Sequence, residues 1–157
     1  GGDSAGGGLA FALLGEILKH GLKKPLGCFA FSPLTDIGFS GGSVARNGKA
    51  DVVLPVERVG EMAEMYLQGA PVRDPRASPL FARFSEGPPV WIAAGTTEIL
   101  LDDTRRMATH LREAGIDVTE VIEEDLPHVW PIFHNLLPEA EATLKELADW
   151  IRLRSGC

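Results

Sequence analysis

The sequence predicts an α/β protein in which the strands of a parallel sheet alternate with helices. Several segments carry apolar residues at helical spacing, and short continuous apolar runs lie between them, as is typical of strands buried on both faces. With 157 residues, 45% of them hydrophobic and 24% charged, the chain has the size and composition of one globular domain. We therefore interpret residues 1–157 as part of a single domain.

Four segments are predicted to be helices because apolar residues recur on one face of each: 9–19, 55–67, 103–114 and 138–153. Gly21, Gly69 and Gly115 supply stop signals after the first three. Asp103 or Thr104 can cap the third helix at its start. The last helix carries an apolar stripe that can cover one face of a sheet.

Three short runs are predicted to be strands: 26–31, 89–94 and 117–123. Their alternation with helices is typical of a parallel sheet. Residues 37–73 lie between the first two strands and form a loop and helical excursion from this pattern. Residues 36–50 are rich in Gly, Ser and Asn and lack apolar periodicity, so we expect a mobile connection there.

Charge and composition exclude several classes of function. The net charge of −7, from 15 basic and 22 acidic residues, argues against nucleic acid as a partner. The longest apolar runs fall short of the roughly 20 residues that span a bilayer, so no membrane span is expected. Cys28 and Cys157 lack the spacing of a zinc site or of a disulfide framework. We expect no metal and favour the cytoplasm, since two cysteines allow a reducing compartment.

The first residues contain a pattern that can carry a nucleophile. Gly2-Asp3-Ser4-Ala5-Gly6 has the G-x-S-x-G spacing of a nucleophile elbow, in which small residues permit a sharp turn from a strand into a helix. Ser4 would project above the sheet, and the backbone N–H of Ala5 would face an oxyanion. The strand that this motif needs is expected before Gly1. The alternative is a glycine-rich turn capped by Asp3 or Ser4.

A serine nucleophile needs a base, and four histidines are available: His20, His110, His128 and His134. His128 is the predicted base because it lies in a short loop directly after a strand, where a side chain can reach across the sheet edge. His20 and His110 lie on predicted helices and are interpreted as surface residues. His134 is the reserve candidate, with a partly buried structural role as the alternative.

The base in turn needs a carboxylate to orient it, and three follow the second predicted strand: Glu98, Asp102 and Asp103. Asp103 is well placed to cap the next helix and Asp102 is its neighbour, whereas Glu98 has no such structural role. Glu98 is therefore the predicted acid. The resulting chain order, Ser4, Glu98 and then His128, is that of the hydrolases built on a parallel sheet.

Four segments make the sequence similar to the hormone-sensitive-lipase family of α/β-hydrolases: GDSAGG at 2–7, SPLTD at 32–36, DPRASPL at 74–80 and LPH at 126–128. The resemblance covers the whole chain. It implies a carboxylesterase for short-chain acyl esters that forms an acyl-enzyme at Ser4, with His128 as base and then acid, and no cofactor. The family usually has Asp in a D-x-L-x-D pattern where this chain has Glu98, so Asp102 is the substitute acid if the longer side chain does not fit.

The resemblance also implies that residues 1–157 correspond to the carboxyl-terminal half of such an enzyme. The family's His-Gly-Gly-Gly loop, which completes the oxyanion hole, and its amino-terminal cap have no counterpart in this sequence. We expect the missing amino-terminal half of the fold to be a partner, and the 157 residues alone to be nearly inactive. Relatives of this kind often dimerise through the last strand and helix, so a homodimer is a further expectation.

Four residues are candidates for the substrate pocket: Phe39, Met62, Tyr66 and Trp130. Each has packing in the core as its alternative interpretation. Three rival functions stay open: a catalytically silent binding module on the same fold, an amidase or peptidase that uses the same triad, and a structural fragment without activity.

Overall fold

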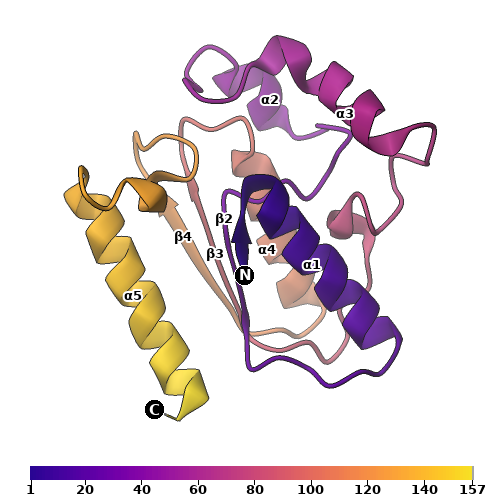
Figure 1. Ribbon diagram of the computed structural model, residues 1–157, viewed down its shortest axis with the longest axis vertical. Helices are drawn as coiled ribbons and strands as arrows, with labels where there is room; N and C mark the ends of the chain where they lie inside the picture. Colours follow the sequence, from indigo (N-terminus) through magenta and orange to yellow (C-terminus); the bar gives the residue numbers. More distant parts are fainter. Residues whose placement is uncertain (157) are drawn as a thin grey trace.

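The computed structural model describes residues 1–156 and has a parallel four-stranded sheet at its centre (Figure 1). The strands are β1 (Gly2–Asp3), β2 (Cys28–Phe31), β3 (Val90–Gly95) and β4 (Val118–Glu123), and they lie side by side in that order. All three pairings are parallel. The predicted α/β class with a parallel sheet is therefore confirmed.

Within residues 1–156, five helices accompany these strands: α1 (Ser4–Lys19), α2 (Gly42–Asn47), α3 (Val59–Leu67), α4 (Leu101–Glu113) and, after the last strand, α5 (Pro138–Ser155). Three short 3₁₀ turns accompany them: η1 (Val56–Arg58), η2 (Pro79–Phe81) and η3 (Trp130–Phe133). Helices α2 and α3 stand apart from the sheet layers, above its carboxyl edge in Figure 1. Both lie between β2 and β3 in the chain.

Two apolar clusters hold the layers together. The helices that contribute to them lie on opposite faces of the sheet, with α1 and α4 on one face and α5 on the other (Figure 1). On one face, Phe11 of α1 and Met107 of α4 pack against alternate strand residues such as Ile92. On the other face, α5 packs through Trp150 against Trp91. Because side chains alternate along a strand, a central strand covered on both faces must be apolar at every position. All six residues of β3 are buried accordingly.

Helix α1 begins five residues earlier than the apolar periodicity indicates, directly at Ser4. Its first turns contain Gly6, Gly7 and Gly8, which add no side chains to a periodic pattern. Gly8 is required by close packing, because a Cβ there would overlap the carbonyl oxygen of Leu34. Gly2 and Asp3, which the motif places in the turn, form the strand β1 that leads into Ser4.

Gly8→Ala is expected to lower the free energy of unfolding by about 3 kcal/mol, because the added methyl group meets rigid backbone. The matched control is Gly60→Ala on α3, where a Cβ has open space around it. That variant should leave stability unchanged or raise it by up to about 1 kcal/mol. Urea denaturation of both variants checks the prediction, and equal effects would contradict the packing argument.

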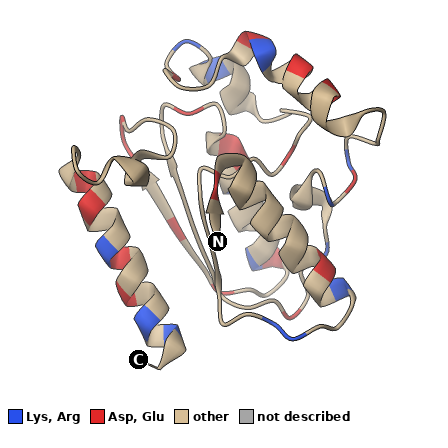
Figure 2. Ribbon diagram, viewed as in Figure 1, with Lys and Arg blue, Asp and Glu red and all other residues tan. Residues whose placement is uncertain are grey.

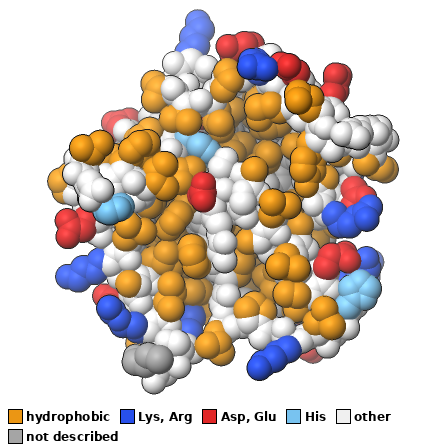
Figure 3. Space-filling model, in the orientation of Figure 1, with side chains coloured by type: hydrophobic (Ala, Val, Ile, Leu, Met, Phe, Trp, Pro, Cys, Tyr) orange, Lys and Arg blue, Asp and Glu red, His pale blue; other side chains and the backbone are white. Residues whose placement is uncertain are grey.

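One flank of the molecule is apolar at its surface. Strand β1 is an edge of the described sheet, and beside it Leu9 and Leu13 of α1 are 55% and 63% exposed. Figure 2 shows few charged residues along α1 before its last turns, and Figure 3 shows apolar side chains gathered on the same face. Among residues 1–156, no helix combines the length and the apolar character needed to cross a bilayer.

Candidate active site

Three side chains that are far apart in the sequence form one line of hydrogen bonds. The hydroxyl oxygen Oγ of Ser4 lies 2.9 Å from Nε2 of His128, and Nδ1 of the same ring lies 2.7 Å from Oε2 of Glu98. An ionised carboxylate only accepts hydrogen bonds, so Nδ1 carries the ring hydrogen and Nε2 is left to accept from Ser4. Glu98 is fully buried and His128 is 5% exposed. The three residues predicted from the sequence are thus brought together.

The parallel topology explains why these residues meet. Ser4 directly follows β1, Glu98 lies three residues after β3, and His128 lies five residues after β4. Because the strands are parallel, their carboxyl ends share one edge of the sheet. Ser4 has a φ of 51°, in the left-handed region, which turns its side chain away from the sheet. A Cβ on Gly2 would lie 2.5 Å from the Gly6 carbonyl, so this turn needs glycine there.

The second carboxylate oxygen of Glu98 is also bonded. Its Oε1 accepts hydrogen bonds from the hydroxyl of Ser32, at 2.8 Å, and from the backbone N–H of Gly95. Sequence reasoning did not assign Ser32 to the site. The signal was available, because Ser32 directly follows β2 and therefore lies at the same sheet edge as the three predicted residues.

The loop that carries Glu98 is held from outside by α2 and the residues after it. The Asn47 side-chain amide donates to the carbonyls of Thr96 and Glu98, at 2.8 and 2.7 Å. Asp51 accepts from the backbone N–H of Ile99 at 2.9 Å. The predicted connection over 36–50 is therefore not irregular throughout, because residues 42–47 form α2. Its Ser and Asn residues suggested a loop, but Ser43 and Asn47 bond to the backbone of the acid's loop.

Asp102 does not take the acid's position in the structure. Both of its carboxylate oxygens accept hydrogen bonds from the Arg46 guanidinium, each at 2.9 Å. One of them also accepts the backbone N–H of Ser43 at 2.8 Å. Nδ1 of His128 is bonded to Glu98 and not to Asp102. The longer glutamate side chain reaches the base, so the substitute is not needed.

Asp103 is not a helix cap, in contrast to the prediction, because α4 begins at Leu101 with Leu100 before it. The Asp103 carboxylate is fully buried and accepts from the backbone N–H groups of Thr35 and Asp36, at 2.8 and 2.9 Å. It thereby ties the segment after β2 to α4. Burial raises the pKa of Asp103 to about 6, opposed by the two backbone hydrogen bonds. Nearby Asp36 raises the pKa further, and Arg106 lowers it.

This raised pKa predicts a pH dependence of stability. Between pH 3.8 and about 6 the native Asp103 binds more protons than the unfolded one, so its contribution to stability falls as pH rises. The full loss is about 3 kcal/mol above pH 6. The side chain introduced by Asp103→Asn does not titrate, so this variant lacks the loss of stability. The free energy of unfolding of the variant minus that of the wild type should therefore increase from pH 4 to pH 7. Urea denaturation at both pH values checks this, and a constant difference would contradict it.

A cavity of about 190 Å³ is lined by Ala5, the residue that follows Ser4 in α1. Leu34 also lines it, and Met62 and Tyr66 line it from α3. Two of the four predicted pocket residues are therefore at this cavity. Phe39 is half-buried and is not part of its lining.

Trp130 is a core residue. It is fully buried in the cluster beneath α5, and its indole N–H donates to the hydroxyl of Thr143 at 3.3 Å. Its predicted role as a pocket wall is wrong, and the packing alternative holds. The tryptophan follows the base too closely in sequence for position alone to separate the two roles.

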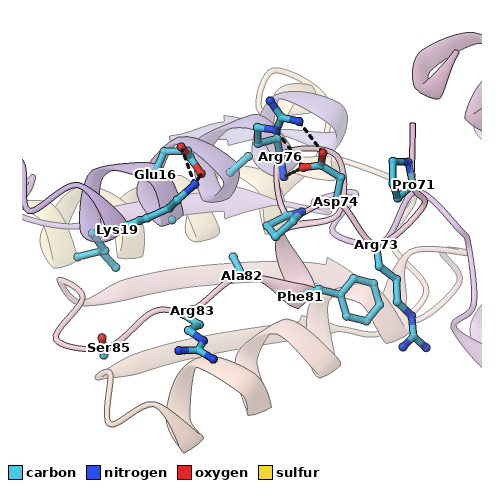
Figure 4. A pocket seen from close by; sticks show the side chains of 14 residues that line it. Glu16, Lys19, Pro71, Arg73, Asp74, Arg76, Phe81, Ala82, Arg83 and Ser85 are labelled. Atoms are coloured by element: carbon cyan, nitrogen blue, oxygen red, sulfur yellow. Dashed lines mark hydrogen bonds and ion pairs between the residues drawn. The ribbon is translucent and has the colours of Figure 1, made fainter. Parts of the chain in front are cut away.

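A larger cavity of about 830 Å³ lies between α1 and residues 71–85 (Figure 4). None of the residues in the Ser4–His128–Glu98 line contributes to its wall. Charged side chains in its wall form ion pairs with one another: Lys19 with Glu16 at 3.1 Å, and Arg76 with Asp74 at 2.6 Å (Figure 4). The smaller cavity is the nearer one in sequence to the hydrogen-bonded serine, because Ala5, the residue after Ser4, lines it.

The remaining histidines lie away from this chemistry. His20 is exposed and contacts Glu16, as expected of a surface residue. His110 is not the surface residue that the sequence predicts: it is partly buried, with Nε2 2.7 Å from the carbonyl oxygen of Ala82. His134 is exposed, not partly buried as predicted. Within residues 1–156, no group of three or more His, Cys, Asp or Glu is arranged to hold a metal ion.

The fold and the serine site at the sheet edge define an α/β hydrolase, and comparisons with known proteins agree. A family model described as "alpha/beta hydrolase fold" matches residues 1–132. An acetyl-hydrolase of Streptomyces hygroscopicus is 33% identical over 155 residues, which are 99% of this chain and 52% of the relative. The chain spans about half the length of the curated relatives it matches.

Solved structures give the same result. The crystal structure of an esterase from the bacterial hormone-sensitive lipase family aligns with a TM-score of 0.94 and 36% identity, over 98% of this chain and 52% of that one. The structure of EstE5 soaked with p-nitrophenyl butyrate aligns with a TM-score of 0.93 and 34% identity, over 99% and 52%. The chain belongs to the hormone-sensitive-lipase family of esterases with the α/β-hydrolase fold.

Proposed function

We propose that residues 1–157 supply the nucleophile, base and acid of a serine carboxylesterase that hydrolyses short-chain acyl esters. The observation that carries this proposal is the unbroken hydrogen-bond line from Ser4 through His128 to Glu98. A serine hydroxyl 2.9 Å from the free nitrogen of an oriented imidazole is an activated nucleophile. The same distance argues against a catalytically silent binding module.

The proposed reaction proceeds through an acyl-enzyme. Oγ of Ser4 attacks the ester carbonyl carbon while Nε2 of His128 takes the hydroxyl proton, and Glu98 stabilises the imidazolium that forms. The proton then passes from Nε2 to the alkoxide oxygen of the leaving alcohol. Water repeats the two steps on the acyl-enzyme, releases the carboxylic acid and restores the serine hydroxyl.

The oxyanion of the transition state requires hydrogen-bond donors, and we assign one of them, the backbone N–H of Ala5. The N–H of Ala5 lies in the first turn of α1, where backbone N–H groups have no partner inside the helix. One oxyanion donor contributes on the order of 3 kcal/mol to transition-state stabilisation, so efficient turnover needs more than Ala5. We infer that a further part of the fold supplies the other donors and covers the apolar flank formed by β1, Leu9 and Leu13. Dimerisation through β4 and α5 stays a prediction of the family resemblance.

The cavity supports a small, apolar acyl or alcohol group. Its volume of about 190 Å³ and its lining by Met62, Tyr66 and Leu34 fit a short hydrocarbon group. A crystal of the related EstE5 was soaked with p-nitrophenyl butyrate, an ester with a short acyl group.

The proposal is tested by comparing kcat/KM for p-nitrophenyl esters of increasing acyl length with kcat/KM for the matched anilides. We expect the rate to be highest for acyl groups of a few carbons and the esters to exceed the amides by a wide margin. Equal or faster cleavage of the amides would favour an amidase or peptidase. Ester turnover that persists in Ser4→Ala would contradict the proposed site.

A further inference from the structure

Ser32 joins the two loops that carry the acid and the base. Its side chain is fully buried directly after β2. The hydroxyl donates to Oε1 of Glu98 at 2.8 Å, and its oxygen accepts the backbone N–H of Val129, the residue after His128, at 3.0 Å. One hydroxyl group therefore contacts both the acid itself and the backbone beside the base.

The backbone at Ser32 is held in a conformation that serine rarely adopts. Its φ is 46°, and Val129 has a φ of 56°, both in the left-handed region. Such residues persist only where the surroundings fix them, and they are concentrated at functional sites. At Ser32 the backbone N–H also donates to the carbonyl of Ala93 at 2.7 Å, which secures the residue to β3.

The acid in this chain has a particular need for such an anchor. Glutamate has one more rotatable bond than aspartate, and rotation about its last bond is only weakly restricted. Without a partner for Oε1, the Glu98 carboxylate could turn away from the imidazole. Ser32 and the N–H of Gly95 both bind Oε1, which leaves Oε2 directed at Nδ1 of His128.

We propose that Ser32 is a positioning residue of the hydrolytic site, whose hydroxyl locks the Glu98 carboxylate to the loop that carries His128. This inference rests on the proposed function. Ser32 acts through Glu98 and does not touch the reacting atoms. Its loss should therefore weaken the orientation of the base in the transition state more than it weakens substrate binding.

The test uses the Ser32→Ala variant of the complete protein. The change removes a hydrogen bond to a charged group and leaves the Val129 N–H without its partner, so kcat should fall by about tenfold to hundredfold. KM should stay within about threefold, because Ser32 does not line the cavity. An unchanged kcat in a folded Ser32→Ala variant would overturn the proposal.

Ser78→Ala is the matched control for a purely structural effect. Ser78 is also fully buried, also donates to one group, the Val72 carbonyl at 2.7 Å, and also accepts one backbone N–H, from Ile37 at 3.0 Å. The two variants should lose similar amounts of thermal stability, and only Ser32→Ala should lose kcat. An equal loss of kcat in both would show that Ser32 is structural only and would overturn the proposal.

A second measurement keeps this inference separate from the proposed function. In proton NMR spectra, the Nδ1 hydrogen of His128 should give a low-field signal that is absent in His128→Gln. Ser32→Ala should shift or broaden this signal, whereas Ser78→Ala should not. If the wild type showed no Ser4-dependent turnover, the esterase proposal would fail, and the NMR signal would still decide the role of Ser32: an unmoved signal in Ser32→Ala rejects it.

Discussion

Replacing Ser4 with alanine is expected to lower kcat for ester hydrolysis by about 10⁵-fold to 10⁶-fold, while the protein stays folded. The reason is chemical, since among residues 1–156 only the Ser4 hydroxyl is hydrogen-bonded to Nε2 of His128. The variant should retain the wild-type circular dichroism spectrum and bind substrate with similar affinity. Residual activity would come from the cavity and from the oxyanion donors alone.

Non-additivity is the control for this prediction. Ser4 and His128 act as one unit in the proposed mechanism, so the double variant Ser4→Ala/His128→Ala should be hardly slower than either single variant. If the two losses multiplied instead, the two residues would contribute independently. That result would contradict the activation of Ser4 by His128.

Glu98→Gln is expected to lower kcat by about 10⁴-fold, by analogy with the loss of the orienting carboxylate in other serine triads. Glutamine keeps the length and shape of the side chain and can still accept the hydrogen bond from Ser32. Its amide lacks the negative charge, however, and can present an N–H to Nδ1 of His128, which would favour the wrong imidazole tautomer. The loss should appear in kcat, with little change in KM.

Asp102→Asn separates the two carboxylates that the sequence leaves as candidates. Asp102 binds Arg46 and the Ser43 backbone, away from the imidazole, so this variant should lose less than about tenfold in kcat. The partner Arg46 is 57% exposed, and the loss of this ion pair should cost no more than about 1 kcal/mol of stability. A loss in Asp102→Asn as large as that in Glu98→Gln would reverse the assignment of the acid.

The three residues of the site were predictable because they depend on rules that act locally. Each of Ser4, Glu98 and His128 follows a strand, and parallel strands bring their carboxyl ends to one edge. The arrangement of helices on both faces of the sheet was predictable for the same reason, since the continuous apolar run at β3 must be covered on both faces. Local sequence patterns that fit only one kind of structure therefore predict both the sheet and the site.

Other features depend on contacts between distant segments. The polar residues of α2 resemble a loop in sequence, because nothing local shows that Asn47 bonds to the carbonyls of Thr96 and Glu98. The start of α1 is hidden by glycines such as Gly8, which is chosen for close approach to Leu34 and not for helix propensity. Trp130 and Asp103 likewise have roles that only the packed structure distinguishes.

The most direct test of the central claim is to treat the protein with a fluorophosphonate, which reacts with activated serines, and to measure its intact mass and then its peptide masses after digestion. We predict a single adduct on the peptide that contains Ser4, formed much more slowly in His128→Gln because the base no longer takes the hydroxyl proton. The absence of an adduct on the folded wild-type protein, or an adduct on a different residue, would contradict the assignment of Ser4 as the nucleophile.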